Sequence, residues 1–241
     1  MFKKIALALA VVASSSFATY TYFPVGEAGS GQVEVGLAHT WHDDWSVTAL
    51  RLKGEYVVMP NLELAVMGIG YQFGDNDGFR ALTLGARYQF MPMLIAAADI
   101  ALPLNSEDVV GTYDPFGIFA AIQYTQNFMP ELALGSELGF SWLFEDEDFE
   151  QGLLMKLQAE LDYTIASIGL TPWVGFEFDY QLTDSEAAGY DVDDSGNNEF
   201  SFWIGAGYAI NAMFSVKANL VIARGDFGDS QEINAALDIN F

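Results

Sequence analysis

Two histidines near the start of the chain are the first residues whose types and spacing could do chemistry. His39 and His42 stand just before Ser46 in the stretch HTWHDDWS, residues 39–46. A histidine within hydrogen-bonding reach of a serine can act as its general base, provided that a third group orients the imidazole. This stretch offers no such third group. We therefore expect no catalysis here, and we predict that His39 faces outward, diagonal to Ser46.

An acidic stretch later in the chain is the second candidate. In DVDDSGNNE, residues 191–199, the side chains of Asp191, Asp193 and Ser195 alternate before a glycine, as at the start of a calcium-binding loop. The twelfth position of such a loop needs a bidentate glutamate, but Phe202 stands there, and the flanking residues have the pattern of strands. A solvated acidic loop is therefore the favoured interpretation, and we expect no resident cofactor.

Charged residues that alternate with apolar ones form the third and largest set. Between Leu153 and Tyr163 every second residue is apolar, and Lys156 and Glu160 lie among the residues between. A period of two over ten residues predicts a strand with one apolar and one polar face. Applied along the chain, the same alternation places these charged side chains on polar faces: Arg51, Lys53, Arg87, Asp99, Glu137, Lys156, Glu160, Asp162, Glu177, Asp179, Lys217 and Asp238, together with Glu34, Glu55 and Glu63.

The composition limits where such strands can be. Apolar residues make up 51% of the chain, yet the formal net charge is −24 and there is no cysteine. Two lysines, an apolar run and the small residues ending at Ala18 predict an export signal over residues 1–18. The absence of cysteine excludes disulfides and thiol chemistry. An acidic chain is also a poor ligand for nucleic acid, so we expect none as a partner.

About twelve alternating segments cover the rest of the chain, although ten cannot be distinguished from twelve by pattern alone. The expected strands are 32–41, 45–58, 62–73, 79–90, 93–104, 115–128, 132–144, 152–164, 168–180, 199–210, 213–225 and 232–241. Segment 62–73 fits the alternation of apolar and polar residues only if a β-bulge places Leu64 and Phe73 on the same face.

The connections between these segments sort into two kinds that alternate along the chain. One kind is short and three times carries Met-Pro, at residues 59–60, 91–92 and 129–130, where proline suits a tight turn. The other kind is longer and acidic, such as 105–114, 145–151 and 181–198. Short turns at one end and long loops at the other are typical of a transmembrane antiparallel up-and-down β-barrel. The barrel must be closed, since an open sheet edge in lipid would leave backbone groups unpaired. A soluble sandwich would expose the outward aromatic residues to water.

The export signal, the alternating strands and the final ALDINF together resemble bacterial outer-membrane β-barrel proteins. The resemblance implies an outer-membrane location, with residues 19–31 as a periplasmic segment and 32–241 as the barrel. It also implies that the last residue, Phe241, is the signal read by the barrel-assembly machinery. Lipid and lipopolysaccharide would be the surrounding partners, with divalent cations bridging lipopolysaccharide to the acidic loops.

The polar faces would then line the interior, with about twice as many acids as bases. Two functions are compatible with such an interior. The first is a small porin-like channel for small solutes with a preference for cations, since rings of acidic side chains favour cations. The second is a non-conducting structural or surface-interaction barrel whose interior charges only satisfy one another.

Overall fold

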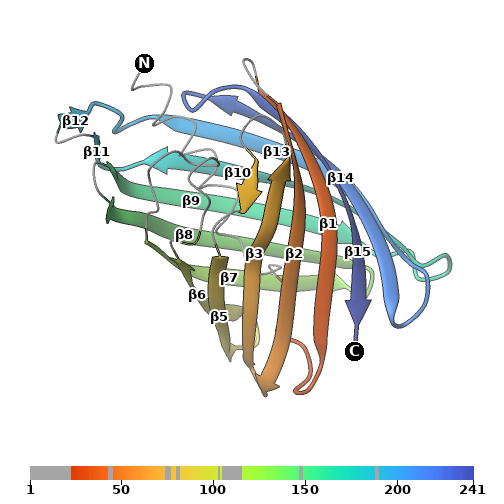
Figure 1. The fold of residues 1–241 in the computed structure, drawn as a ribbon. Helices are drawn as coiled ribbons and strands as arrows, with labels where there is room; N and C mark the ends of the chain where they lie inside the picture. The colour runs from red at the N-terminus through yellow and green to blue at the C-terminus, as the bar shows by residue number, and fades with distance from the viewer. Residues whose placement is uncertain are drawn as a thin grey trace.

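The protein folds into an all-β barrel (Figure 1). The computed structural model describes residues 23–42, 46–73, 77–79, 82–102, 104, 116–146, 149–187 and 190–241. Within these ranges no helix is long and apolar enough to cross a membrane.

Twelve long strands make the barrel wall, as the alternation predicts. Their bounds are β1 Gly31–His42, β2 Ser46–Met59, β3 Leu62–Phe73, β5 Leu82–Met91, β6 Leu94–Leu102, β7 Gly117–Met129, β8 Leu132–Asp146, β9 Phe149–Tyr163, β10 Leu170–Gln181, β13 Asn198–Ala209, β14 Phe214–Gly225 and β15 Ser230–Asn240. Three short strands lie in the connections: β4 Gly78–Phe79, β11 Ser185–Ala187 and β12 Tyr190–Val192.

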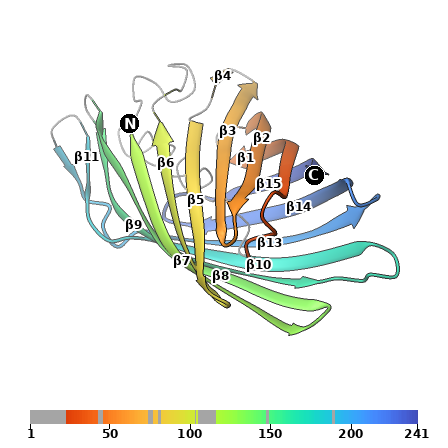
Figure 2. The same cartoon turned by 90° about the horizontal axis from the view of Figure 1, so that it is seen from below.

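The wall is closed because its last strand pairs with its first. Each long strand pairs antiparallel with the next, and β15 pairs with β1 from Gln32↔Asn240 to His42↔Ser230. Seen from below, the strands succeed one another around the barrel (Figure 2). Closure leaves no open edge in the wall of twelve long strands, which is the condition for a sheet to span lipid.

The two faces of each strand differ as the alternation requires. On β7, Phe119, Gln123 and Thr125 are buried inside the barrel, whereas Ile118 and Ile122 on the other face are exposed, the latter by 48%. Large apolar side chains exposed in this way along every long strand form a lipid-facing surface.

The predicted bulge in residues 62–73 is present. Lys53 of β2 lies opposite Met67 of β3, while its neighbour Leu52 lies opposite Ile69, so the register shifts by one residue at this point. An extra residue on one strand reverses the parity of the residues after it. Leu64 and Phe73 are therefore both exposed, although one number is even and the other odd.

Both chain ends of the barrel lie beside the short turns. The turns after β2, β5 and β7 each begin with Met-Pro, and Asn61 takes a positive φ of 69° in the first. Tyr56, Tyr88 and Tyr163 point outward just before short turns, where an interfacial aromatic belt is expected. At the same end Phe241 exchanges backbone hydrogen bonds with Gly31 and stacks on the Tyr56 ring.

The long connections hold more structure than the sequence suggests. The connection expected at 181–198 contains the hairpin of β11 and β12, which projects at the end of the barrel opposite the C-terminus (Figure 1). β9 begins at Phe149 instead of the expected residue 152. Its early residues gain backbone partners because β11 pairs with Phe149 and Glu150.

Residues 23–30, which precede β1 in the chain, lie along the inner side of the barrel. The backbone of Gly29 and Ser30 bonds to Val57, which extends the pairing of β1 with β2. Further back, the amide of Val25 donates to Gln89 Oε1 at 3.1 Å. Because Gln89 is on the inward face of β5, this segment lies inside the barrel beside β2 to β5, near the short turns. The predicted boundary between residues 1–18 and 19–31 falls on residues 1–22, outside the described residues, and stays a prediction.

Candidate functional site in the barrel interior

The interior is where the sequence places the charged candidates, and their side chains do lie there. All of them belong to the inward parity of their strands: Arg51, Lys53, Arg87, Asp99, Glu137, Lys156, Glu160, Asp162, Glu177, Asp179, Lys217 and Asp238, with Glu34, Glu55 and Glu63. That they line a path for solutes stays a prediction.

Two further carboxylates, Glu199 and Glu232, face the same interior and are missing from the sequence-based set. Glu199 is only 5% exposed, and it alternates on β13 with the inward residue Ser201. Glu232 alternates on β15 with Asn234 and Asp238. The period of two that identifies the other candidates would have found both.

One half of the interior holds charges that neutralise one another, and we name it the paired wall. It is the inward surface of β14, β15, β1, β2, β3 and β5. Arg51 of β2 reaches across β1 to Glu232 of β15, with Nη2 2.9 Å from Oε2 and Nη1 3.2 Å from Oε1. Thr40 and Asn234 donate to the same carboxylate, at 2.6 and 2.8 Å. Two parallel hydrogen bonds from one guanidinium fix the geometry as well as the charge.

Three more bases on the paired wall are bound in the same way. Lys217 bridges Glu34 and Asp238, at 2.5 and 3.2 Å. Lys53 pairs with Glu55 on its own strand. The third is Arg87, which pairs with Glu63. The paired wall thus carries five carboxylates against four bases.

Arg87 forms the most buried of these pairs. Its Nε and Nη2 lie 3.1 and 2.9 Å from the two carboxylate oxygens of Glu63, and both residues are 3% exposed. Its remaining nitrogen, Nη1, donates to the carbonyl of Phe23 at 2.7 Å. This arginine therefore joins the wall to the segment of residues 23–30.

The other half of the interior has few bases, and we name it the acidic wall. It is the inward surface of β6, β7, β8, β9, β10 and β13. Seven carboxylates belong to it, from Asp99, Glu137, Glu160, Asp162, Glu177, Asp179 and Glu199. Lys156 is the one base among its described residues. The two walls together therefore leave the interior acidic mainly on one side.

Lys156 occupies the position between neighbouring strands that the sequence predicts. Its Nζ lies 3.0 Å from Glu177 Oε2 and 3.5 Å from Asp179 Oδ2, and the residue is 1% exposed. Pairing with Glu177 is as expected. The carboxylate of Glu137, on the other neighbouring strand, instead accepts hydrogen bonds from the amides of Gln123 and Gln158.

Aromatic side chains also face the acidic wall, although the alternation places most aromatics toward lipid. Trp203 of β13 lies flat over Gly175 of β10, so close that a Cβ on the glycine would stand 2.3 Å from the ring. Trp173 of β10 lies in the same way over Gly205 of β13. The Trp203 ring is fixed by its Nε1, which donates to Glu160 Oε2 at 2.6 Å.

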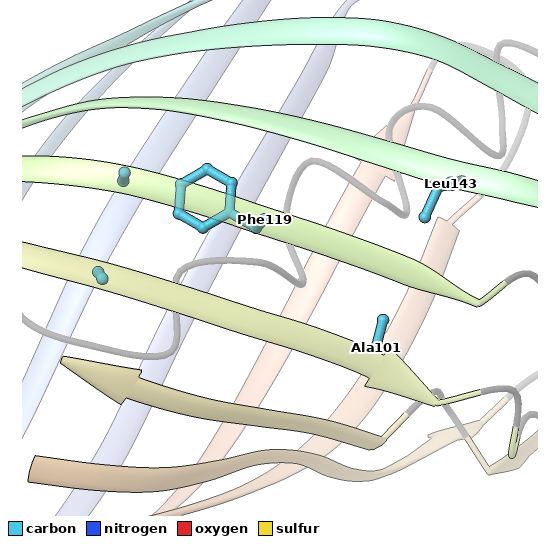
Figure 3. Close-up of a cluster of buried hydrophobic side chains, with 5 residues drawn as sticks. Ala101, Phe119 and Leu143 are labelled. Atoms are coloured by element: carbon cyan, nitrogen blue, oxygen red, sulfur yellow. The ribbon is translucent and has the colours of Figure 1, made fainter.

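A third aromatic ring, that of Phe119, makes an apolar area on β6 to β8. It lies over Gly139 and packs with Leu143, Ala101 and two more alanines (Figure 3). An aromatic side chain over a glycine on the next strand covers exposed backbone and pins the register.

The remaining sequence candidates lie outside the interior charge network. His39 faces outward as predicted, with Nδ1 2.7 Å from Thr48 Oγ1 and its ring edge-on to Trp41. In the loop hairpin Asp184 and Asp194 accept the hydrogen bonds, instead of the calcium candidates Asp191 and Asp193. The described ranges contain no group of three or more His, Asp or Glu residues that could hold a metal ion. The calcium hypothesis, which also names Ser195, gains no support from this geometry.

Comparison with known proteins identifies the family. The model of the family described as "Putative MetA-pathway of phenol degradation" matches residues 13–230. The chain belongs to this family. None of the curated proteins matches the sequence.

Solved structures of outer-membrane barrels share this family member's fold. An outer membrane channel from Pseudomonas putida F1 aligns with a TM-score of 0.71 and 15% identity, over 91% of this chain and 98% of that chain. The translocator domain of NalP from Neisseria meningitidis has a TM-score of 0.62 and 10% identity, with 98% and 97% covered. For the NanC porin the values are 0.60 and 8%, with 86% and 98% covered. At these identities the likeness shows the fold, an integral barrel of the outer membrane.

Proposed function

We propose that this barrel is a passive channel for small solutes and that it prefers cations to anions. The observation that carries the proposal is the acidic wall, where seven inward carboxylates stand against Lys156 alone among the described residues. Fixed charges of one sign along a pore raise the local concentration of ions of the opposite sign. The bases of the paired wall do not offset this, because carboxylates already neutralise them.

The comparisons support a channel and suggest which solutes to test. Among the similar structures, one bears the name outer membrane channel and another is the NanC porin. The family description names a pathway of phenol degradation, so small phenols belong among the solutes to test.

Single-channel recording in a planar bilayer tests the proposal. The purified barrel, separating two KCl solutions of different concentration, should give conductance steps and a reversal potential of the sign set by potassium permeation. A reversal potential of the opposite sign would overturn the cation preference. A folded barrel that migrates differently before and after heating, yet gives no steps, would overturn the channel itself.

A surface-interaction role is the second candidate, and the hairpin of β11 and β12 favours it. Tyr190 at this hairpin is 77% exposed, and Glu186 and Asp191 pair across it. In this role divalent cations would bridge the acidic loops to lipopolysaccharide. Removing divalent cations with a chelator should then release lipopolysaccharide from the purified protein. No catalytic activity is proposed, and recognition of Phe241 by the assembly machinery stays a proposal drawn from the resemblance.

A further inference from the structure

Trp173 and Asp162 lie side by side on the acidic wall. They are direct partners in the pairing of β10 with β9, and both face the interior. Directly paired side chains on one face of a sheet are near enough for one small molecule to touch both. One face of the Trp173 ring covers β13, since a Cβ on Gly205 or Gly207 would stand 2.4 or 3.3 Å from ring atoms. The opposite face is turned to the interior.

Asp162 brings a hydrogen-bond acceptor that the wall does not use. Its Oδ1 is buried and has no hydrogen-bond partner in the part of the chain that the structure describes. Its neighbour on the same face, Glu160, is already committed to the indole of Trp203. A buried acceptor without a donor destabilises the fold. A ligand that donates a hydrogen bond to it therefore gains more binding free energy than it would at an acceptor that already has a donor.

We propose that Trp173 and Asp162 form a binding site for small phenols within the barrel. The phenol ring stacks on the interior face of Trp173, and its hydroxyl donates a hydrogen bond to Asp162 Oδ1. Stacked aromatic rings gain more than their buried area alone would give. A hydrogen bond to a charged acceptor is stronger than one to a neutral acceptor. The ligand must be the neutral phenol, because the carboxylates of Asp162 and Glu160 repel a phenolate.

The other aromatic rings of the interior do not offer this combination. Trp203 is 7% exposed, and the carboxylate beside it is occupied by its own indole N–H. Phe119 packs among alanines and Leu143 in an apolar cluster (Figure 3). Trp173 is the inward ring that lies directly beside an acceptor with no partner among the described residues.

Equilibrium binding to the full-length barrel in detergent tests the site, with phenol and its methyl ether anisole as the probes. Anisole has the same ring but no donor, so it should bind about tenfold more weakly than phenol, as for loss of one hydrogen bond to a charged group. Replacing Asp162→Leu should remove that difference, whereas Trp173→Leu should weaken both probes by a few-fold. Asp162→Asn, which keeps the shape and an acceptor without charge, should give an intermediate loss for phenol and none for anisole.

Glu199→Gln is the matched control. Glu199 also has a buried carboxylate oxygen without a hydrogen-bond partner among the described residues, but its direct neighbours are Asp179 and Gly225, not an aromatic residue. The variant should bind phenol like the unmodified protein. Equal binding of phenol and anisole, or unchanged binding in both Asp162→Asn and Trp173→Leu, would overturn the site.

Biologically, the site rests on the proposed channel, since its ligand must enter the barrel, but the two fail in different experiments. Binding in detergent requires no conduction. A barrel that conducts cations but does not distinguish phenol from anisole would overturn the binding site and support the channel. A barrel that distinguishes the probes but gives no conductance steps would support the binding site and overturn the channel.

Discussion

The paired wall and the acidic wall enclose the same interior but treat their charges differently. On the paired wall each base contacts a carboxylate across strands or along its own strand, and five carboxylates face four bases. On the acidic wall Lys156 holds Glu177 and Asp179, and the described residues of this wall offer no second base to Glu137, Glu160, Asp162 and Glu199.

This difference separates two uses of buried charge. A charge that is matched by a partner and by hydrogen bonds fixes the positions of strands, and its field cancels at a distance. A charge without a base acts instead on whatever enters the barrel. We infer that the charges of the paired wall stabilise the fold and that those of the acidic wall determine ion selectivity. Removing a charge should therefore lower stability on the paired wall and change selectivity on the acidic wall.

Breaking the most buried pair of the paired wall should have the largest effect. Glu63→Gln leaves the guanidinium of Arg87 buried without its carboxylate, which costs about 3 kcal/mol by comparison with other broken buried pairs. It should lower the free energy of unfolding measured by denaturant titration in detergent micelles. Adding Arg87→Met, which removes the buried charge left without its partner, should recover most of the loss. If the single and double variants were equally unstable, the pairing would not be the source of stability.

Filling space under an aromatic ring should destabilise the acidic wall by a smaller amount. In Gly175→Ala the new Cβ would stand 2.3 Å from the Trp203 ring, so the ring must move, at a cost of about 2 kcal/mol for overpacking. Gly54 of β2, on the outward face between Lys53 and Glu55, has nothing within 4 Å of an added Cβ and provides the control. Unfolding in denaturant should show Gly175→Ala destabilised and Gly54→Ala unchanged or slightly stabilised. Equal stability of the two variants would mean that the stacked ring does not fix the wall.

The sequence predicts the barrel better than it predicts its walls. Alternation places β3 at residues 62–73, as observed, and anticipates the bulge beside Lys53, because inward and outward positions differ so strongly in polarity. The hairpin of β11 and β12 is missed because strands of three residues are too short to show a period. Parity likewise places Lys156 inside and next to the strand of Glu177.

What alternation cannot supply is the cross-strand register. The position of Trp173 over Gly205 depends on the length of the intervening loop and its hairpin, which no period of two encodes. The division into two walls has the same origin. Arg51 meets Glu232 because β15 closes against β1, and these two residues are 181 positions apart in the chain.

Removing charge from the acidic wall should change selectivity without changing shape. Asp162 Oδ1 and Glu199 Oε2 are buried carboxylate oxygens with no hydrogen-bond partner among the described residues, so the double variant Asp162→Asn and Glu199→Gln removes charge without removing a hydrogen bond to either atom. Two fewer charges should lower the cation-to-anion permeability ratio about fivefold, equivalent to about 1 kcal/mol. On the paired wall, Glu34→Gln leaves Lys217 with Asp238 and should keep the ratio within about twofold of the unmodified value. Reversal potentials in a KCl gradient measure both, and an equal change in the two variants would remove the distinction between the walls.

Salt should produce the smallest change and should act on one wall only. Raising ionic strength from about 0.1 to about 1 M shortens the screening length from about 10 to about 3 Å. Charges of the acidic wall that act on a passing ion across the interior are then screened, so the cation preference should fall by about twofold.

The pair of Arg87 and Glu63 is in direct contact and buried, so the same salt should leave its share of the unfolding free energy unchanged. Reversal potentials at several KCl concentrations with a fixed concentration ratio, and denaturant titrations of Glu63→Gln at the same salts, measure the two walls independently. A selectivity that did not respond to salt would place its origin in contacts as close as those of the paired wall, and the division of roles would be wrong.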